Sequence, residues 1–419
     1  MRFQLPSLLL RGAVIAGIAG IAALAVAASA AGPRVYVGNF KDNTVSVVEV
    51  DEGKVVATVP VAAGPDGIVV SADGKSVFVS GSSASSVSVI DAARDSVSKT
   101  IEVGMGPQGL ALGPGGKQVL VAVNGADRVA FVDAASGAIA DTAAVPKPHT
   151  IAIKPDGSQA YVSSQQPGNF SVAIVDMATH KVTGTIALDK APRDLEFGPG
   201  GKLLYLTLAG APAVQVVDAV ANKIVAQIPT GVSPHIAQHF GGMSQGVVVV
   251  QGPGELQFFD PATNAVARSI TVGKQPHWVD ITPDGKRLVV SNEGGNTIDI
   301  VDPASGKTQT VDVGNAPRKV AMQHVSSVAG NSGTKVSIAN FAFVPGPTTI
   351  TAGQSVNWRN DDGAPHGLAF KDNAPGAPLL LPGEQFTRRF DKPGSYEYVC
   401  SVHAYMTGVV VVKPGQAGG

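Results

Sequence analysis

Short apolar runs separated by turns fill most of the chain after residue 33. Between residues 276 and 315 these runs cover 278–282, 288–291, 297–302 and 308–313, and Pro283-Asp284-Gly285 separates the first two. Valine, isoleucine and threonine dominate the runs, which favours strands, while proline and glycine supply the backbone angles of a tight turn. The runs lack the spacing of an amphipathic helix. The pattern predicts four short antiparallel strands in this stretch.

The same pattern returns with a period near 42 residues. One marker is a proline, at Pro65, Pro107, Pro148, Pro192, Pro234, Pro276 and Pro317. A second marker is an acidic residue, at Glu49, Asp91, Asp133, Asp176, Asp218, Asp260 and Asp302. Four strands in each unit of about 42 residues are typical of a β-propeller blade. The markers therefore predict an all-β protein with a seven-bladed β-propeller over residues 31–325.

The phase of the repeat predicts how the ring closes. The chain enters the repeat at residues 34–37, which match a second strand, and leaves it at residues 319–322, which match a first strand. Strands from both ends should share one blade, which leaves no open sheet edge. Residues 35–39 with 43–48, and 291–292 with 296–300, resemble the YVTN-type β-propeller repeat. That resemblance implies the fold and is nearly silent on activity.

The amino terminus has the pattern of an export signal. Arg2 and Arg11 precede an uncharged apolar run over residues 12–31, within which Ala28-Ser29-Ala30 places small residues at a cleavage site. We expect residues 1–30 to be a signal peptide and the mature protein to be periplasmic, with no membrane attachment. The alternative is an uncleaved anchor, because about twenty apolar residues can span a bilayer.

Composition excludes several classes of protein. The 31 Lys and Arg residues nearly balance the 32 Asp and Glu residues, which gives a net charge of −1. A nucleic-acid binder needs a basic face to neutralise phosphates, so we expect no nucleic-acid partner. The single cysteine, Cys400, excludes an internal disulfide framework. The 50 glycines and 29 prolines among 419 residues fit a turn-rich all-β protein rather than a disordered chain.

Residues with metal-ligand character gather after the repeat. Residues 326–334 have the composition of a linker, and a second set of strands is predicted in a domain over residues 335–419. This domain contains His366, and Cys400, His403 and Met406 form a C-x2-H-x2-M motif. A thiolate and two imidazoles with a weak thioether suit a copper ion that alternates between Cu(I) and Cu(II). Zinc is the main alternative, but one cysteine with a methionine is a poor structural zinc set.

Residues 356–360, Pro365-His366 and 394–408 resemble the plastocyanin/amicyanin cupredoxins, and the short ligand loop is most similar to amicyanin. The resemblance implies a Greek-key β-sandwich with a type 1 (blue) copper centre. It implies His366, Cys400 and His403 as equatorial ligands and Met406 as the axial ligand. Many members have asparagine after the first ligand histidine, where this chain has Gly367, so the rigidity and potential of the site are open questions.

The edge of the site near His403 is expected to meet solvent. Val402, Ala404 and Tyr405 surround this histidine with little charge. We interpret this edge as a docking patch for an electron-transfer partner, and an ordinary loop surface is the alternative.

A second site is predicted in the propeller. The residues that follow the repeat prolines are Asp66, Gln108, His149, Arg193, His235, His277 and Arg318. First strands line the channel of a propeller, so these side chains should converge near one mouth. His149, His235, His277, Arg193 and Arg318 are therefore candidate catalytic residues that could hold copper and an anion. A hydrated polar mouth, with its charges balanced by Asp66, is the alternative.

Three further histidines are assigned no catalytic role. His239 is expected to be a buried structural residue or a further ligand beside His235, and His180 and His324 are expected to be solvated at turns.

A propeller followed by a cupredoxin resembles nitrous-oxide reductase. That enzyme uses two cysteines in its electron-accepting centre and seven histidines in its catalytic cluster, whereas this chain offers one cysteine and three ring histidines. The architecture is therefore similar, and the reaction is not carried over.

Three functional hypotheses follow from these observations. The first is a periplasmic type 1 copper protein that exchanges single electrons with a partner such as a c-type cytochrome or a periplasmic dehydrogenase or reductase, with the propeller as docking scaffold. The second is a copper oxidoreductase with catalytic copper on the channel histidines, which receives electrons from the cupredoxin domain. The third is a copper-binding or sensing protein without a redox partner.

Overall fold

The computed structural model describes Met1 and residues 32–414 except 72, 241–242, 284, 324–333, 340, 363, 373, 375, 381–383 and 404. The chain divides into residues 1–31 and a unit that starts at Gly32, to which nearly all described residues belong. The expected signal peptide after Met1, most of the expected linker, His324 and Ala404 lie outside the described residues. Among the described residues, no helix has the length and apolar character needed to cross a membrane.

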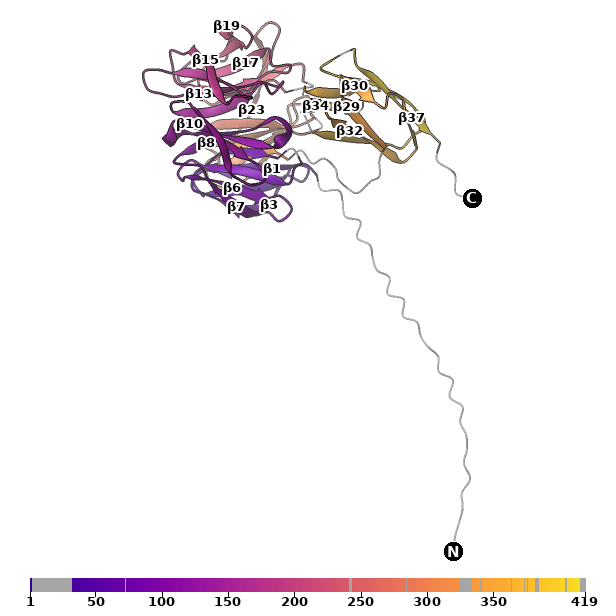
Figure 1. Cartoon of the computed structure of the whole chain (residues 1–419). Coiled ribbons are helices and arrows are strands. Elements are labelled where there is room, and N and C mark those ends of the chain that lie inside the picture. Colours follow the sequence, from indigo (N-terminus) through magenta and orange to yellow (C-terminus); the bar gives the residue numbers. More distant parts are fainter. Residues whose placement is uncertain are drawn as a thin grey trace. The chain divides into compact units, whose positions relative to one another are not determined.

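The propeller consists of seven four-stranded sheets within the described residues (Figure 1). The blade that closes the ring contains β28 (Pro317–Met322), β1 (Arg34–Asn39), β2 (Thr44–Glu49) and β3 (Lys54–Pro60). The next blade contains β4 (Pro65–Val70), β5 (Ser76–Gly81), β6 (Ser86–Asp91) and β7 (Ser96–Glu102). Two further blades contain β8 (Pro107–Leu112), β9 (Gln118–Val123), β10 (Arg128–Asp133) and β11 (Ile139–Ala144), and β12 (Pro148–Ile153), β13 (Gln159–Ser164), β14 (Ser171–Asp176) and β15 (Lys181–Ala187), respectively.

The other three sheets are β16 (Pro192–Phe197), β17 (Leu203–Leu208), β18 (Ala213–Asp218) and β19 (Lys223–Pro229); β20 (Pro234–Gln238), β21 (Gly246–Val250), β22 (Glu255–Asp260) and β23 (Ala265–Thr271); and β24 (Pro276–Ile281), β25 (Leu288–Asn292), β26 (Thr297–Val301) and β27 (Thr308–Asp312). Two 3-10 turns, η1 (Pro114–Gly116) and η2 (Asn124–Ala126), flank β9. The first strand of each blade begins at its repeat proline, two residues before the predicted run in the blade of β24.

Ring closure follows the predicted phase. Strand β28 pairs antiparallel with β1, which places Met322 opposite Val35 and Val320 opposite Val37. The first strands contact one another in the order β4, β8, β12, β16, β20, β24, β28 and back to β4. The strand that ends the repeat thus completes the blade that begins it. This confirms the seven-bladed propeller.

The acidic marker of the repeat has a local role in six of its seven copies. In the loop after β6, the Oδ1 atom of Asp91 accepts hydrogen bonds from the backbone N–H groups of Ala93 and Arg94. Equivalent bonds form at Asp133, Asp176, Asp218, Asp260 and Asp302. A short carboxylate that satisfies backbone donors stabilises such a turn. Glu49 instead pairs with Arg34.

A hydroxyl on several second strands fixes the start of the neighbouring first strand. Ser80 Oγ donates to the carbonyl oxygen of Gln108, Thr207 Oγ1 to that of His235, and Ser291 Oγ to that of Arg318. Each acceptor is the residue that follows a repeat proline in the next blade. These bonds satisfy buried carbonyl groups and hold the channel residues at a defined position.

The carboxy-terminal strands form two facing sheets. One sheet has the order β30 (Ala342–Val344), β29 (Thr334–Ala339), β32 (Gln354–Asn360) and β35 (Gln385–Phe390); the other has β31 (Thr348–Thr351), β37 (Thr407–Lys413), β36 (Gly394–Val399), β33 (His366–Phe370) and β34 (Ala377–Leu380). Their shared core contains Trp358, Phe370, Phe390 and Tyr398, with Trp358 and Tyr398 fully buried. This arrangement confirms the predicted cupredoxin sandwich.

Candidate metal centre

Three neighbouring strands position the predicted ligands. His366 begins β33, Cys400 follows directly after β36, and His403 and Met406 lie in the loop between β36 and β37. Strand β36 pairs with both neighbours, through Val399 with Ala369 of β33 and with Thr407 of β37. The loop closes on itself, because Cys400 N donates to Met406 O and Met406 N donates to His403 O, each at 2.9 Å. The short loop therefore holds its ligand residues with little freedom.

The ligand atoms form a compact triangle. The Nδ1 atoms of His366 and His403 lie 3.3 Å apart, and each lies 3.7 Å from Cys400 Sγ. A triangle with these sides has a centre roughly 2.1 Å from each corner, close to the metal–nitrogen distance of about 2.0 Å and the metal–sulfur distance of about 2.3 Å. Within the described residues this is the one group of three or more His, Cys, Asp or Glu residues that could hold a metal ion.

Two backbone N–H groups stabilise a negative charge on the sulfur of Cys400. Cys400 is buried, and its Sγ accepts N–H groups from the backbone of Gly367 at 3.4 Å and of His403 at 3.3 Å. Donors that point at a ligand sulfur tune the reduction potential of the metal. Gly367 thus contributes through its backbone, although it lacks the asparagine side chain found in many cupredoxins.

A carboxylate behind the first ligand sets its tautomer. Asp362 Oδ2 lies 2.8 Å from His366 Nε2, and the His366 side chain is fully buried. A carboxylate accepts a hydrogen bond from an N–H group, so the hydrogen of His366 is on Nε2. The lone pair of Nδ1 then points towards Cys400 and His403. Burial lowers the pKa of His366 against the raising effect of Asp362. At neutral pH the imidazole is therefore neutral, as a metal ligand must be.

Asn360 fixes the segment that carries this carboxylate. It is fully buried, and its Nδ2 donates to the carbonyl oxygens of Ala364 at 2.8 Å and Leu380 at 2.7 Å. Its Oδ1 accepts the backbone N–H of Asp362 at 3.0 Å. Sequence reasoning did not assign Asn360 or Asp362 a role, although Asn360 stands in the segment that resembles the cupredoxins.

Met406 is buried in the same core cluster as Cys400. Its place in the loop is compatible with the axial position that the resemblance implies, and this role stays a prediction.

Two aromatic residues flank the solvent side of the site. Phe341 packs edge-on against both imidazoles, with centroid distances of 5.4 Å to His366 and 5.0 Å to His403. It is 44% exposed, and Tyr405, beside His403, is 71% exposed. Sequence reasoning named Tyr405 and missed Phe341, which approaches the site from a distant part of the chain.

The channel residues of the propeller are only partly gathered. The rings of His235 and His277 lie side by side with centroids 3.9 Å apart, and Arg318 pairs with Asp66 at 3.3 Å. His149, His235 and His277 do not form a ligand group of the kind found around Cys400 in the described residues. Their proposed catalytic role, with Arg193 and Arg318, stays a prediction.

Two of the remaining histidines have structural contacts. His180 lies in a turn as expected, and its side chain is 17% exposed because it stacks on Phe131 with a centroid distance of 3.8 Å and lies 2.8 Å from Asp141. His239 lies just beyond β20 and contacts Met243 O at 3.0 Å through its Nε2 atom. This contact favours a structural role for His239.

Comparison with protein families gives matches in both regions. Residues 331–413 match the plastocyanin/azurin family of copper binding proteins. Residues 10–114 match the YNCE-like beta-propeller family, and residues 236–354 match the Choice-of-anchor I domain.

Curated relatives match the carboxy-terminal region. Amicyanin-alpha of Methylorubrum extorquens is 34% identical over 99 residues, which are 22% of this chain and 82% of the relative. Plastocyanin of Scenedesmus fuscus is 36% identical over 84 residues, which are 17% of this chain and 86% of the relative.

Solved structures share the propeller fold. Kuenenia stuttgartiensis hydrazine synthase superposes with a TM-score of 0.59 at 21% identity, covering 68% of this chain and 94% of that one. Dihydro-heme d1 dehydrogenase NirN in complex with DHE gives 0.55 at 16% identity, covering 71% of this chain and 76% of that one. At these identities the likeness concerns the fold alone.

The donor set, the dimensions of the triangle and the matched relatives agree on a type 1 copper site. Through its carboxy-terminal domain the chain belongs to the plastocyanin/azurin family of copper-binding proteins, as a blue copper electron-transfer domain joined to a seven-bladed β-propeller whose first part matches the YNCE-like model.

Proposed function

We propose that this protein is exported to the periplasm, carries one type 1 copper ion, and exchanges single electrons with a redox protein that docks near His403. The observation that carries the proposal is the triangle of His366, Cys400 and His403, of which the first two are buried and His403 is partly exposed. When bound there, copper supplies a one-electron couple. A c-type cytochrome or a periplasmic dehydrogenase or reductase is the class of partner proposed.

The protein residues around the site favour electron transfer over substrate chemistry. His366 and Cys400 are buried, and the backbone N–H groups that point at Cys400 Sγ belong to strand β33 (Gly367) and to the closed ligand loop (His403). The site thus shields His366 and Cys400 from bulk water and keeps the spacing of the ligand atoms fixed. A site that rearranges little as its charge changes transfers electrons at low cost in reorganisation.

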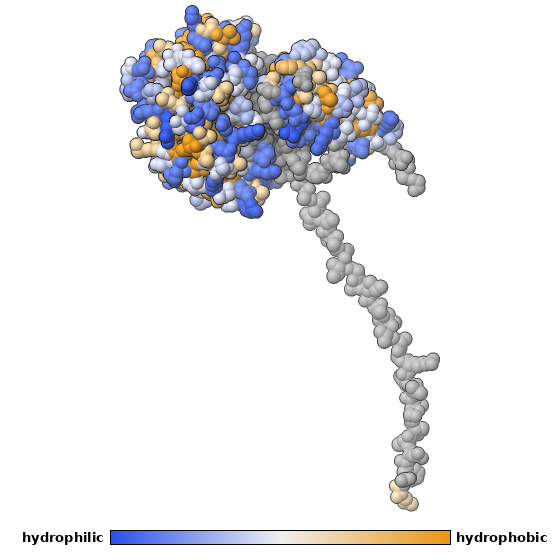
Figure 2. All heavy atoms as spheres, in the orientation of Figure 1, coloured by the Kyte–Doolittle hydropathy of each residue, from blue (hydrophilic) through white to orange (hydrophobic). Residues whose placement is uncertain are grey.

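The edge formed by Phe341, His403 and Tyr405 supports docking on this side. Both aromatic side chains are substantially exposed and lie against the histidine rings. Exposed aromatic residues are enriched where proteins bind one another. Val402 is only partly exposed, and Ala404 lies outside the described residues. Figure 2 shows hydrophilic side chains over much of the visible face, interrupted by smaller apolar patches.

The metal content and visible spectrum of the mature protein test the copper assignment. We expect one copper for each fully loaded chain and a strong thiolate-to-copper absorption. Both should disappear in Cys400→Ala, while His180→Gln, which changes a histidine of the propeller, should keep them. A carefully reconstituted protein without that absorption would refute the proposal. Additional copper that survives Cys400→Ala and disappears in His235→Ala would instead support the oxidoreductase hypothesis.

Stopped-flow oxidation by a purified c-type cytochrome tests the docking edge. Tyr405→Glu and Phe341→Glu should slow the second-order reaction while oxidation by ferricyanide changes much less. Thr349→Glu is the matched control, because Thr349 is exposed and its register with Val411 and Ser395 places it at the end of the sheet away from the ligand loop. Equal rates in all variants would count against this edge as the docking site.

A further inference from the structure

Several residues that follow the repeat prolines form an arc at one mouth of the propeller channel. In consecutive blades the positions on β16, β20, β24 and β28 are Arg193, His235, His277 and Arg318. These strands contact one another around the ring, and the His235 and His277 rings lie side by side. Hydroxyl groups of the preceding blades hold the carbonyl oxygens of His235 and Arg318. The arc is therefore fixed at the level of the backbone.

One nitrogen of each imidazole at this mouth lacks a hydrogen-bond partner. The Nδ1 atoms of His149, His235 and His277 are shielded from solvent and have no partner among the described residues, and the same is true of Gln108 Oε1. Buried polar atoms in folded proteins nearly always have a partner, and those that lack one point to an unseen ligand or water. Four such atoms on four of the seven first strands thus indicate a binding site.

The two arginines of the arc differ in their counterions. Arg318 pairs with Asp66 at 3.3 Å and with Glu293 at 3.1 Å. Arg193 donates to Ser233 Oγ and Gln251 Oε1, both at 3.0 Å, and forms no ion pair in the described part of the chain. One guanidinium on the arc therefore keeps its charge without a carboxylate partner.

Lys319 adds a positive charge that acts on His235 and His277. Lys319 lies with its Nζ 3.8 Å from the centroid of the Trp278 ring. Burial raises the pKa of Asp194 well above its usual range, so this carboxyl is a poor counterion, and raises that of Glu196 to about 7, which leaves it only partly ionised at neutral pH.

Burial and the neighbouring positive charges also lower the pKa values of the histidines. Burial first, and then the positive charge of Arg193, lower the pKa of His235 to about 3, and burial lowers that of His277 well below its usual range. Both imidazoles are therefore neutral N–H donors at neutral pH. A metal cation would meet repulsion from Arg193 and Lys319, whereas an anion would be attracted.

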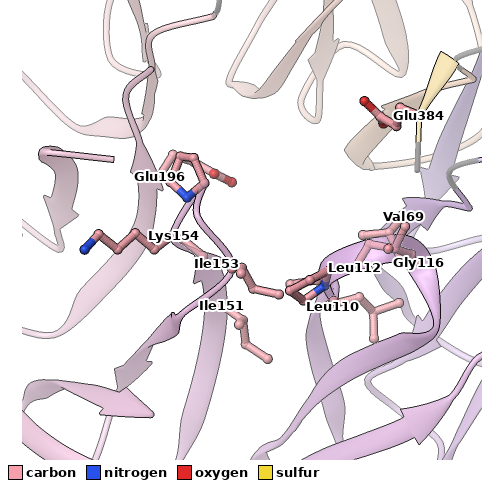
Figure 3. Close-up of a pocket in the computed structure, with 16 residues that line it drawn as sticks. Val69, Leu110, Leu112, Gly116, Ile151, Ile153, Lys154, Glu196 and Glu384 are labelled. Atoms are coloured by element: carbon pink, nitrogen blue, oxygen red, sulfur yellow. The ribbon is translucent and has the colours of Figure 1, made fainter. Parts of the chain in front are cut away.

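We propose that Arg193, His235, His277 and Arg318 form a binding site for a small oxyanion that carries one negative charge. Guanidinium and imidazole N–H groups would donate to its oxygens, and the single charge would balance Arg193. The site lies where the first strands begin. Leu112 ends β8 and Ile153 ends β12, and both line a hollow (Figure 3), which therefore lies toward the other mouth of the channel. This inference is independent of the copper site and extends the role of the propeller beyond that of a scaffold.

Calorimetric titration of the copper-loaded mature chain with sodium formate and with sodium nitrite tests the proposal. Both ions carry one negative charge on two oxygens. The ion that binds with the higher affinity shows whether the site prefers a carboxylate or an inorganic oxyanion. We expect saturable binding of one ion for each chain, and no binding of formamide, the neutral counterpart of formate. Emission from Trp278, which adjoins His277, should change with the same midpoint, and Trp278→Phe should remove that change.

Two substitutions and a control assign the binding to the arc. Arg193→Gln and His277→Gln should each weaken binding at least about tenfold, the effect of losing one charge-assisted hydrogen bond. Arg94→Gln should bind as the unchanged protein does, because Arg94 is a surface residue that pairs with Asp91. If Arg193→Gln does not fold, Arg193→Lys should weaken binding and retain the dependence on charge.

Several results would overturn the proposal. They are no saturable heat with either ion, equal affinity in the arc variants, formamide binding as strong as formate binding, or uptake of a copper ion that His277→Gln abolishes. Each of these would leave the absorption of the copper domain unchanged, so failure here is distinguishable from failure of the copper assignment.

Discussion

Replacing Asp362 by asparagine removes the charge behind a ligand histidine while keeping an oxygen that can accept its hydrogen bond. Asp362 Oδ2 lies 2.8 Å from His366 Nε2, and its side chain is only 12% exposed. The carboxylate stabilises the oxidised state of a bound copper ion more than the reduced state, because the oxidised ion carries one more positive charge. Asp362→Asn should therefore raise the reduction potential.

The size of the effect follows from the geometry. The hydrogen bond, the imidazole ring and a metal–nitrogen bond together span roughly 7 Å. A unit charge at that distance contributes about 2.4 kcal/mol at an effective dielectric constant of about 20. For a one-electron couple about 1.4 kcal/mol corresponds to about 59 mV, so the expected rise is up to roughly 100 mV.

Cyclic voltammetry or a redox titration of the blue absorption measures this change. Asp361→Asn is the matched control, because Asp361 is the neighbouring residue, is 38% exposed and pairs with Arg359 rather than with the ligand histidine. The reduction potential of Asp361→Asn should rise by less than about a third of that amount, because solvent screens the charge of Asp361. An unchanged or lower potential in Asp362→Asn, or equal shifts in both variants, would refute the reasoning.

Three further predictions concern stability. Asn360→Ala removes three hydrogen bonds and should destabilise the copper-free domain by about 2–3 kcal/mol in urea unfolding, together with a weaker copper affinity in chelator competition; an unchanged midpoint and affinity would contradict this. Gly408→Ala places a Cβ 2.3 Å from Cζ of the buried Tyr398 and should lower stability by about 1–3 kcal/mol, whereas Gly346→Ala, which meets no neighbour, should change it little. The pKa of His235 falls to about 3 in the folded protein and is about 6.5 when unfolded. Between these values the unfolded chain binds the extra proton, so stability falls as pH falls. His235→Gln should reduce that slope by up to about 1.4 kcal/mol per pH unit, and identical slopes in denaturation series from pH 7 to pH 4 would refute this.

Local repetition explains why the fold could be predicted. Each blade contains its own strands and turn residues, such as Asp91 with its backbone donors. The sequence of one unit is therefore enough to predict the strands of that blade. The ligand loop was predictable for a similar reason. Cys400, His403 and Met406 lie within seven residues, and so short a chain segment keeps them together whatever surrounds it.

The surroundings of the copper site could not be predicted in the same way. Phe341 and Asp362 reach His366 because two loops of the sandwich meet there, and Phe341 N donates to Asp362 Oδ2 at 2.8 Å. The spacing of these residues in the sequence does not predict that contact. Likewise, His180 is at a turn by sequence, and only the packing of β10 beneath it provides Phe131 for stacking.

The sequence alone determined the number of blades, the phase of ring closure and the donor types of the metal site, because each is written in residues close together or repeated at fixed intervals. Tertiary structure decided which ring histidines touch, where the positive charge lacks a counterion and which carboxylate supports His366. Those features depend on distances between segments far apart in the chain, and such distances exist only after the ring and the sandwich have closed.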